Sequence, residues 1–266
     1  MAILQANIFS KCLMRTVTIH AVLPADRFVF PGQKAPEEKP SKTLYLLHGI
    51  FGNYTDWVAG TRIAPWAMEK NLAVIMPSGD NRFYVDSEAT GEAYGEFIGV
   101  ELPTLCEKLF HLSAKREDRY IAGLSMGGYG AIRNGLKYHD RFSYAAGLSS
   151  GFILDGVLQS TNEAADLPTH KRSFYEAVFG NLEKLRGSDM DYKALVRKLR
   201  AQGAAFPKLY LACGTEDFLI AQNRDFHQYL LSEGIEVTYE EGPGAHEWNF
   251  WDTYIKHVLD WLPTNE

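Results

Sequence analysis

The sequence predicts an α/β fold, with a mostly parallel central sheet, helices on both faces and a helical insertion. Three observations lead to this fold class. Short apolar runs, typical of strands buried on both faces, alternate with segments of helical period along most of the 266 residues. The alternation stops only over 152–203, which shows no strand pattern. The hydrophobic content of 46% is enough for one full core, so we expect a single domain over 1–266.

The first part of the chain predicts a strand pair at the sheet edge and then two buried strands. Residues 2–9 and 14–23 are rich in apolar and β-branched side chains, as in paired strands. Residues 24–42 hold four of the 11 prolines and many charges, which indicates a surface loop. The runs 43–47 and 72–76 predict buried strands, with a short helix over 64–70 between them.

The middle of the chain predicts a long helix between two further strands. Residues 81–86 form an excursion after the second buried strand. Apolar residues then recur with helical period over 93–112, and Pro103 should kink this helix or mark where it begins. Strands are predicted at 120–122 and 142–148.

The last part of the chain begins with the segment 152–203, which we interpret as a helical insertion over the carboxyl edge of the sheet. Right-handed crossovers between parallel strands place every loop after a strand on that edge, where ligands bind. Regular alternation resumes after the insertion, in this order: strand 209–213, helix 218–232, strand 235–239, helix 247–262.

Composition limits the partners and the compartment. The net charge is −6 and no Lys/Arg-rich run occurs, which argues against nucleic acid or an anionic membrane as a partner. Cys12, Cys106 and Cys213 lie too far apart for a zinc site and are odd in number, so they predict free thiols. No basic segment precedes the apolar N-terminal residues, and no apolar run approaches the ~20 residues of a membrane span. We therefore expect a cytoplasmic protein, and a homo-oligomer stays open.

Residues 118–130 carry the clearest signal of chemistry. An apolar run leads into Gly-Leu-Ser-Met-Gly, centred on Ser125, and a small-residue helical pattern follows. This order predicts a strand, a tight turn and a helix, with Ser125 strained and its hydroxyl above the sheet. The helix N-terminus favours negative charge beside it. A plain glycine-rich loop is the alternative, and the strand and helix on either side argue against it.

A serine hydroxyl needs a base to accept its proton, and the base needs a third group to hold its tautomer. The loop after strand 209–213 holds Asp217, and the loop after strand 235–239 holds His246. Both loops belong to the edge where Ser125 is expected. We predict His246 as the base and Asp217 as its orienting acid. Asp217 could instead cap the following helix, and Glu216 is a neighbouring rival for the acid.

Backbone amides must stabilise the negative charge that develops on the substrate oxygen. Met126 follows the nucleophile directly and is the first predicted donor. The loop after strand 43–47 should provide the second. We predict the amide of Ile50, with Phe51 as the alternative, and His48 as either a contributor or a packed histidine that shapes the loop.

Aromatic side chains near the predicted edge are candidates for an apolar substrate pocket. We predict Phe51, Trp57, Tyr84 and Trp248 as substrate-binding residues, although core packing would explain any one of them equally well. No metal or cofactor is expected. The glycine-rich stretch 123–130 lacks both the Lys-Ser/Thr ending of a phosphate loop and the spacing of a dinucleotide fingerprint.

Four motifs of the chain carry a resemblance to a known family: His48-Gly49-Ile50-Phe51-Gly52, Pro77-Ser78-Gly79-Asp80, Gly123-Leu124-Ser125-Met126-Gly127-Gly128 and Gly244-Ala245-His246. With these motifs the chain resembles the esterase-D-type branch of the α/β-hydrolases over about residues 44–261. This group includes tributyrin esterases, S-formylglutathione hydrolases, feruloyl esterases and the antigen 85 acyltransferases. Within it the resemblance points to the bacterial tributyrin-type esterases, as His48-Gly49 and the Asn-Arg-Phe-Tyr that follows Pro-Ser-Gly-Asp at 77–84 suggest.

The resemblance implies a triad of Ser125, Asp217 and His246, with an oxyanion hole from the Ile50 and Met126 amides. The leading hypothesis is a serine carboxylesterase that hydrolyses short-chain acyl esters of small molecules through an acyl-enzyme. The alternatives are an S-formylglutathione hydrolase, a feruloyl or acetyl-sugar esterase, and an acyltransferase with the same triad. A non-catalytic binding protein on the same scaffold is a further alternative, and the intact set of triad candidates argues against it.

Overall fold

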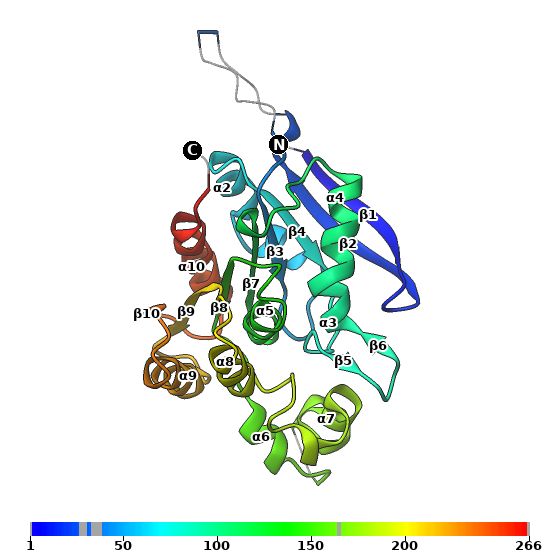
Figure 1. Ribbon diagram of the computed structural model, residues 1–266, viewed down its shortest axis with the longest axis vertical. Helices are drawn as coiled ribbons and strands as arrows, with labels where there is room; N and C mark the ends of the chain where they lie inside the picture. The colour runs from blue at the N-terminus through cyan, green and yellow to red at the C-terminus, as the bar shows by residue number, and fades with distance from the viewer. Residues whose placement is uncertain (1, 27–30, 33–38, 164–165, 265–266) are drawn as a thin grey trace.

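The computed structural model describes residues 2–26, 31–32, 39–163 and 166–264. Its main feature is an eight-stranded sheet in the order β1-β2-β4-β3-β7-β8-β9-β10 (Figure 1). The six strands from β4 to β10 run parallel, and β2 runs opposite to both its neighbours. The strand bounds are β1 (Ala2–Ser10), β2 (Arg15–Leu23), β3 (Thr43–Leu47), β4 (Ala73–Pro77), β7 (Arg119–Leu124), β8 (Tyr144–Leu148), β9 (Lys208–Gly214) and β10 (Val237–Gly242).

The central strands are buried on both faces, as their apolar runs predict. In β3, Leu44 and Leu46 belong to one apolar cluster, whereas Tyr45 and Leu47 belong to a second cluster on the other side of the sheet. Successive side chains of a strand point to opposite faces, so a strand between two cores must be apolar at every position. This explains why these strands have continuous apolar runs and not an alternating pattern.

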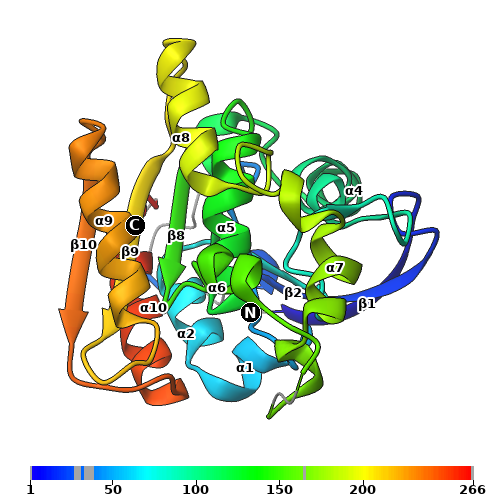
Figure 2. The same ribbon diagram turned by 90° about the horizontal axis from the view of Figure 1, so that it is seen from below.

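Helices cover both faces of the sheet, which confirms the predicted fold class. Figure 2 shows α5 and α8 on one side of the sheet and α1, α2 and α10 on the other. The first face is covered by α3 (Tyr94–Glu96), α4 (Leu102–Leu109), α5 (Met126–Lys137), α8 (Tyr192–Ala201) and α9 (Ile220–Ser232). The second face is covered by α1 (Asp56–Gly60), α2 (Ile63–Glu69) and α10 (Trp248–Trp261). None of the helices among the described residues is long and apolar enough to cross a membrane.

The predicted helix over 93–112 is divided into three pieces. The short helix α3 leads into a π-helical turn, η2 (Phe97–Glu101), and α4 begins directly after it. Pro103 lies in the first turn of α4. Because proline has no N–H to donate to the preceding turn, it is tolerated where a helix begins. Pro103 therefore marks the start of a helix. A small ribbon of β5 (Asp86–Ser87) and β6 (Glu92–Ala93) precedes this region.

The segment 152–203 is less uniform than the sequence predicts. Its first part, of which the structure describes residues 152–163 and 166–190, lies beyond the carboxyl ends of the parallel strands (Figure 1), and we call these described residues the cap. The cap contains α6 (Leu154–Gln159), η4 (Pro168–His170), α7 (Arg172–Phe179) and η5 (Leu182–Lys184). Helix α8 instead packs against α5 and α9 beside the sheet. The prediction that all of 152–203 lies over the carboxyl edge therefore does not apply to α8, because the apolar face of this helix belongs to the main core.

Candidate active site

Ser125 stands at the tight turn between β7 and α5. Its backbone has a φ of 54° and a ψ of −119°, a conformation that costs a non-glycine residue free energy. The flanking glycines make this turn sterically feasible. A Cβ on Gly123 would lie 2.3 Å from the Gly127 carbonyl oxygen, and a Cβ on Gly127 would lie 2.4 Å from the Leu47 carbonyl oxygen. Only glycine at both positions allows the strand and the helix to approach this closely.

His246 lies between Ser125 and Asp217. Its Nε2 is 3.0 Å from the Ser125 Oγ, and its Nδ1 is 2.8 Å from Asp217 Oδ2. Asp217 is buried, and its second oxygen accepts a hydrogen bond from the Leu219 amide at 2.8 Å. Asp217 therefore stabilises the turn before α9 and contacts His246 at the same time. The rival acid Glu216 is exposed and accepts a hydrogen bond from the Gly244 amide instead.

The Asp217 carboxylate is held in its charged form. Burial alone would raise its pKa, but hydrogen bonds with His246, the Leu219 amide and Ser149 together lower the pKa below its ordinary value. An anion at Nδ1 of His246 favours the tautomer that carries the proton on that nitrogen. Nε2 is then free to accept the proton of the Ser125 hydroxyl. This is the geometry that a serine nucleophile and an oriented base require.

Two backbone amides beside Ser125 are available to bind an anionic oxygen. Met126 is the first residue of α5, so its N–H has no partner within the helix. The Ile50 amide makes no hydrogen bond to any described residue. The Phe51 amide, in contrast, donates to Asn81 Oδ1 at 2.8 Å. Of the two amides considered as the second oxyanion donor, the Ile50 amide therefore has no hydrogen-bond acceptor among the described residues, whereas the Phe51 amide already has one.

His48 orients the peptide that carries the Ile50 amide. The Gly79 amide donates to its Nε2 at 2.8 Å, so its proton must lie on Nδ1, which is 2.7 Å from the Gly49 carbonyl oxygen. Burial lowers the pKa of His48, which agrees with a neutral ring. In a trans peptide the N–H points away from the C=O. By binding the Gly49 oxygen, His48 therefore turns the Ile50 N–H to the opposite side. Of the two roles considered for His48, the structure therefore supports that of a packed histidine that shapes its loop.

A cavity of about 340 Å³ opens beside Ser125. The loops after the strands contribute the apolar or aromatic side chains of Ile50, Phe51, Phe83, Met126, Phe218 and Leu219. The cap contributes Ile153, Val157, Ser160, Thr169, His170 and Tyr175. The Ser125 hydroxyl thus opens into a largely apolar space that lies between the sheet edge and the cap.

Of the four predicted substrate-binding residues, only Phe51 lines this cavity. The prediction was wrong for Trp57, Tyr84 and Trp248, which do not line it. Trp57 is only 1% exposed, and its Nε1 donates to the Leu47 carbonyl at 3.0 Å. Tyr84 is fully buried, and its hydroxyl donates to the His48 carbonyl at 2.9 Å. Trp248 packs edge-on against Trp57 with ring centroids 5.8 Å apart. Trp57 and Tyr84 therefore belong to the core, and Trp248 packs against it.

Sequence reasoning missed most of the cavity wall. The cap residues belong to a segment without strand periodicity, so nothing in the pattern shows which of its apolar side chains face the site. Phe218 and Leu219 could have been found, because they follow Asp217 directly on a loop at the carboxyl edge. The ring of Phe218 lies 4.6 Å from that of His246 and is 72% exposed.

Comparisons with known proteins agree with this geometry. Residues 10–262 match the model of a family described as "Putative esterase". The chain belongs to this esterase family. An acetyl esterase from Caldicellulosiruptor saccharolyticus is 45% identical over 268 residues, which cover 98% of each chain. The similarity therefore extends over nearly the whole chain.

Solved structures show the same fold. The fluorophosphonate-binding serine hydrolase F of Staphylococcus aureus, with substrate bound, is 34% identical, with a TM-score of 0.86 over 99% of both chains. An S-formylglutathione hydrolase from the same organism is also 34% identical, with a TM-score of 0.83 over 98% of both chains. The chain therefore has the α/β-hydrolase fold and is a serine esterase.

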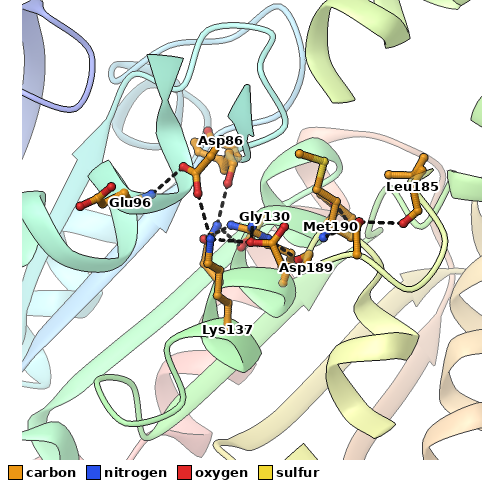
Figure 3. A network of polar contacts seen from close by, with 12 residues as sticks. Asp86, Glu96, Gly130, Lys137, Leu185, Asp189 and Met190 are labelled. Carbon is orange, nitrogen blue, oxygen red and sulfur yellow. Dashed lines mark hydrogen bonds and ion pairs between the residues drawn. The ribbon is translucent and has the colours of Figure 1, made fainter. Parts of the chain in front are cut away.

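The cap of this esterase is fastened to the helix that follows Ser125. Lys137 of α5 lies between two carboxylates, 2.9 Å from Asp86 and 2.6 Å from Asp189 (Figure 3). The fully buried Arg133 also contacts Asp189, at 2.9 Å. These cations lower the pKa of Asp189, although its burial alone would raise it. The carboxyl end of the cap is therefore tied to the same helix whose N-terminus faces the cavity.

Proposed function

We propose that this esterase hydrolyses short-chain acyl esters, acetyl esters among them, with Ser125 as the nucleophile. The observation that carries the proposal is the line of hydrogen bonds from Ser125 through His246 to Asp217, with distances of 3.0 and 2.8 Å, beside an open cavity. The 45% identity with an acetyl esterase supports acetyl groups as the acyl part. Activity toward tributyrin and a cytoplasmic location, both expected from the sequence, remain parts of this proposal.

The first half of the reaction forms an acyl-enzyme. The Ser125 Oγ attacks the ester carbonyl carbon while Nε2 of His246 accepts the hydroxyl proton. The carbonyl π electrons move to the oxygen, and the Ile50 and Met126 amides donate hydrogen bonds to that anion. When the tetrahedral intermediate collapses, the C–O bond to the alcohol breaks. His246 gives its proton to the departing alkoxide oxygen.

The second half releases the acid. Water attacks the acyl-enzyme carbonyl as His246 accepts one of its protons, and the same two amides stabilise the second intermediate. Collapse of this intermediate breaks the bond to the Ser125 Oγ, which recovers the proton from His246. Asp217 stays ionised throughout and stabilises the imidazolium that forms twice in each cycle.

Replacement of the nucleophile tests this function. Ser125→Ala should lower kcat for p-nitrophenyl acetate by several orders of magnitude, because no other described hydroxyl lies within hydrogen-bond distance of His246. The variant should melt at about the temperature of the wild type, since the substitution keeps the Cβ and removes only the hydroxyl that contacts His246. A matched control is Ser160→Ala, which changes a serine of the cavity wall whose hydroxyl donates to the Val157 carbonyl. Undiminished turnover by Ser125→Ala would refute the proposal.

A second candidate activity is thioester hydrolysis of S-formylglutathione, favoured by the 34% identity with a hydrolase of that substrate. The same attack and the same amides would serve a thioester carbonyl. A panel of p-nitrophenyl esters from acetyl to octanoyl, with tributyrin, a feruloyl ester and S-formylglutathione, separates the candidates by kcat/KM. Added alcohol that captures the acyl group faster than water does would instead indicate an acyltransferase.

A further inference from the structure

Two large aromatic side chains are exposed at the cavity beside Ser125. Phe51 and Phe218 both line this cavity, and they are 63% and 72% exposed. A single exposed apolar side chain needs no explanation, but two that line the same cavity provide an apolar surface for a ligand. Neither ring takes part in a step of the proposed reaction. The two rings therefore bear on which ester the site accepts.

Phe218 lies directly beside the proposed base. Its ring centroid is 4.6 Å from that of His246, and the two ring planes are inclined at 48°. Trp251 also packs against His246, edge-on, with centroids 4.9 Å apart. Trp251 is only 5% exposed, so its ring is used up in packing, whereas Phe218 keeps most of its surface free. The imidazole is thus bordered by apolar surface that no described residue covers.

The proposed reaction fixes where the alcohol part of the ester must lie. His246 gives its proton to the departing alkoxide oxygen, so this oxygen has to be within hydrogen-bond distance of Nε2. The carbonyl oxygen is bound elsewhere, by the amides of Ile50 and Met126. The carbon atoms attached to the alkoxide oxygen therefore lie beside the imidazole, which is where the exposed ring of Phe218 is found.

We propose that Phe218 is a specificity-determining residue that contacts the alcohol part of the substrate. The preferred substrates are then short-chain acyl esters, acetates among them, of alcohols that carry an aromatic ring close to the ester oxygen. Contact between such a ring and Phe218 removes apolar surface of both from water, and edge-to-face or offset stacking adds to this gain. This inference rests on the proposed esterase function and names the alcohol side of its substrate class.

The test compares benzyl acetate with ethyl acetate, with kcat/KM measured from the acid released at constant pH. Both esters form the same acetyl-enzyme, so a difference in kcat/KM arises before the alcohol departs. The wild type should prefer benzyl acetate. Phe218→Ala should reduce this preference about three- to tenfold, which is the effect of one aromatic contact.

Two further variants serve as controls. Phe218→Tyr keeps the ring and should retain the preference for benzyl acetate. Phe9→Ala removes a ring of β1 that is 59% exposed but is not among the residues that line the cavity, and it should leave kcat/KM for both esters unchanged. Because Phe218 is mostly exposed, Phe218→Ala should melt at about the temperature of the wild type.

Three results would overturn the proposal. The first is a wild type that hydrolyses both esters without preferring benzyl acetate. The second is an equal fall in kcat/KM for both esters in Phe218→Ala, which would show that Phe218 acts only by packing against His246. The third is a Phe218→Ala variant with unchanged kcat/KM for both esters. Failure of the esterase function itself is distinguishable, because in that case Ser125→Ala would leave p-nitrophenyl acetate turnover intact.

Discussion

Asn81 offers a sharp test of how the oxyanion-binding loop is held. Its side-chain oxygen accepts the hydrogen bond of the Phe51 amide at 2.8 Å, and Phe51 has a φ of 69°. The Ile50 amide, proposed to bind the substrate oxygen, lies one residue before this strained position. Asn81→Leu removes the acceptor and keeps a side chain of similar size. We expect the loop to relax and the Ile50 amide to leave its position for much of the time.

The magnitude follows from the hydrogen bond and the strain. A hydrogen bond contributes about 0.5–1.5 kcal/mol, and a bulky residue at positive φ costs about 1–3 kcal/mol. A loss of about 1 kcal/mol lowers the equilibrium constant between the competent and the relaxed loop about fivefold. Complete loss of one oxyanion donor sets the upper limit, at about 10²- to 10³-fold in kcat. Because His48 still holds the Gly49 carbonyl, we expect kcat to fall by about 5- to 100-fold.

The assay is hydrolysis of p-nitrophenyl acetate, with kcat and KM determined separately. The loop stabilises the anionic oxygen, so kcat should fall much more than KM rises. The melting temperature should change little, because Asn81 and Phe51 are both at least partly exposed. Asn7→Leu is a matched control, since Asn7 accepts a hydrogen bond from Thr18 in the β1–β2 strand pair. An unchanged kcat, or the same loss in Asn7→Leu, would refute the reasoning.

Two further predictions concern the acid and the core. The lowered pKa of Asp217 stabilises the folded protein above the ordinary carboxyl pKa of about 3.9, and this contribution disappears as pH falls through the lower native value. The difference in urea midpoint between the wild type and Asp217→Asn should therefore shrink from pH 7 to pH 3, and a constant difference would contradict this. Trp57→Phe should destabilise the protein by about 1–3 kcal/mol, through a lost hydrogen bond to Leu47 and a small cavity, with KM for p-nitrophenyl acetate unchanged. A raised KM of Trp57→Phe with unchanged stability would contradict this and would indicate that Trp57 contacts the substrate.

The sequence was sufficient to predict which chain segments meet at the site. Ser125, Asp217 and His246 all follow apolar runs, and parallel strands bring the loops after such runs to one edge. The two glycines around Ser125 indicated the tight turn, because few other arrangements need glycine at both positions. These signals are local, and each can be recognised without knowledge of the rest of the fold.

The wall of the cavity could not be predicted in the same way. Trp57, Tyr84 and Phe83 are all large apolar side chains near the carboxyl edge, and only Phe83 lines the cavity. The direction of each side chain depends on contacts from distant segments. The Tyr84 ring, for example, fills the space that Gly79 and Gly130 leave free. Burial in the core and exposure to a pocket produce the same apolar composition, so composition alone does not separate them.

Backbone strain is concentrated where the proposed chemistry occurs. Among the described non-glycine residues with positive φ, six follow the carboxyl ends of β3, β4, β7 and β8: Phe51, Asp80, Phe83, Tyr84, Ser125 and Ser149. Such conformations persist only when surrounding contacts fix them. Here hydrogen bonds from the Phe51 amide to Asn81 and from the Tyr84 hydroxyl to the His48 carbonyl contribute, as does the packing of the two apolar clusters. The stable core is thus what allows the edge to hold Ser125 and the free amides in positions that short peptides would avoid.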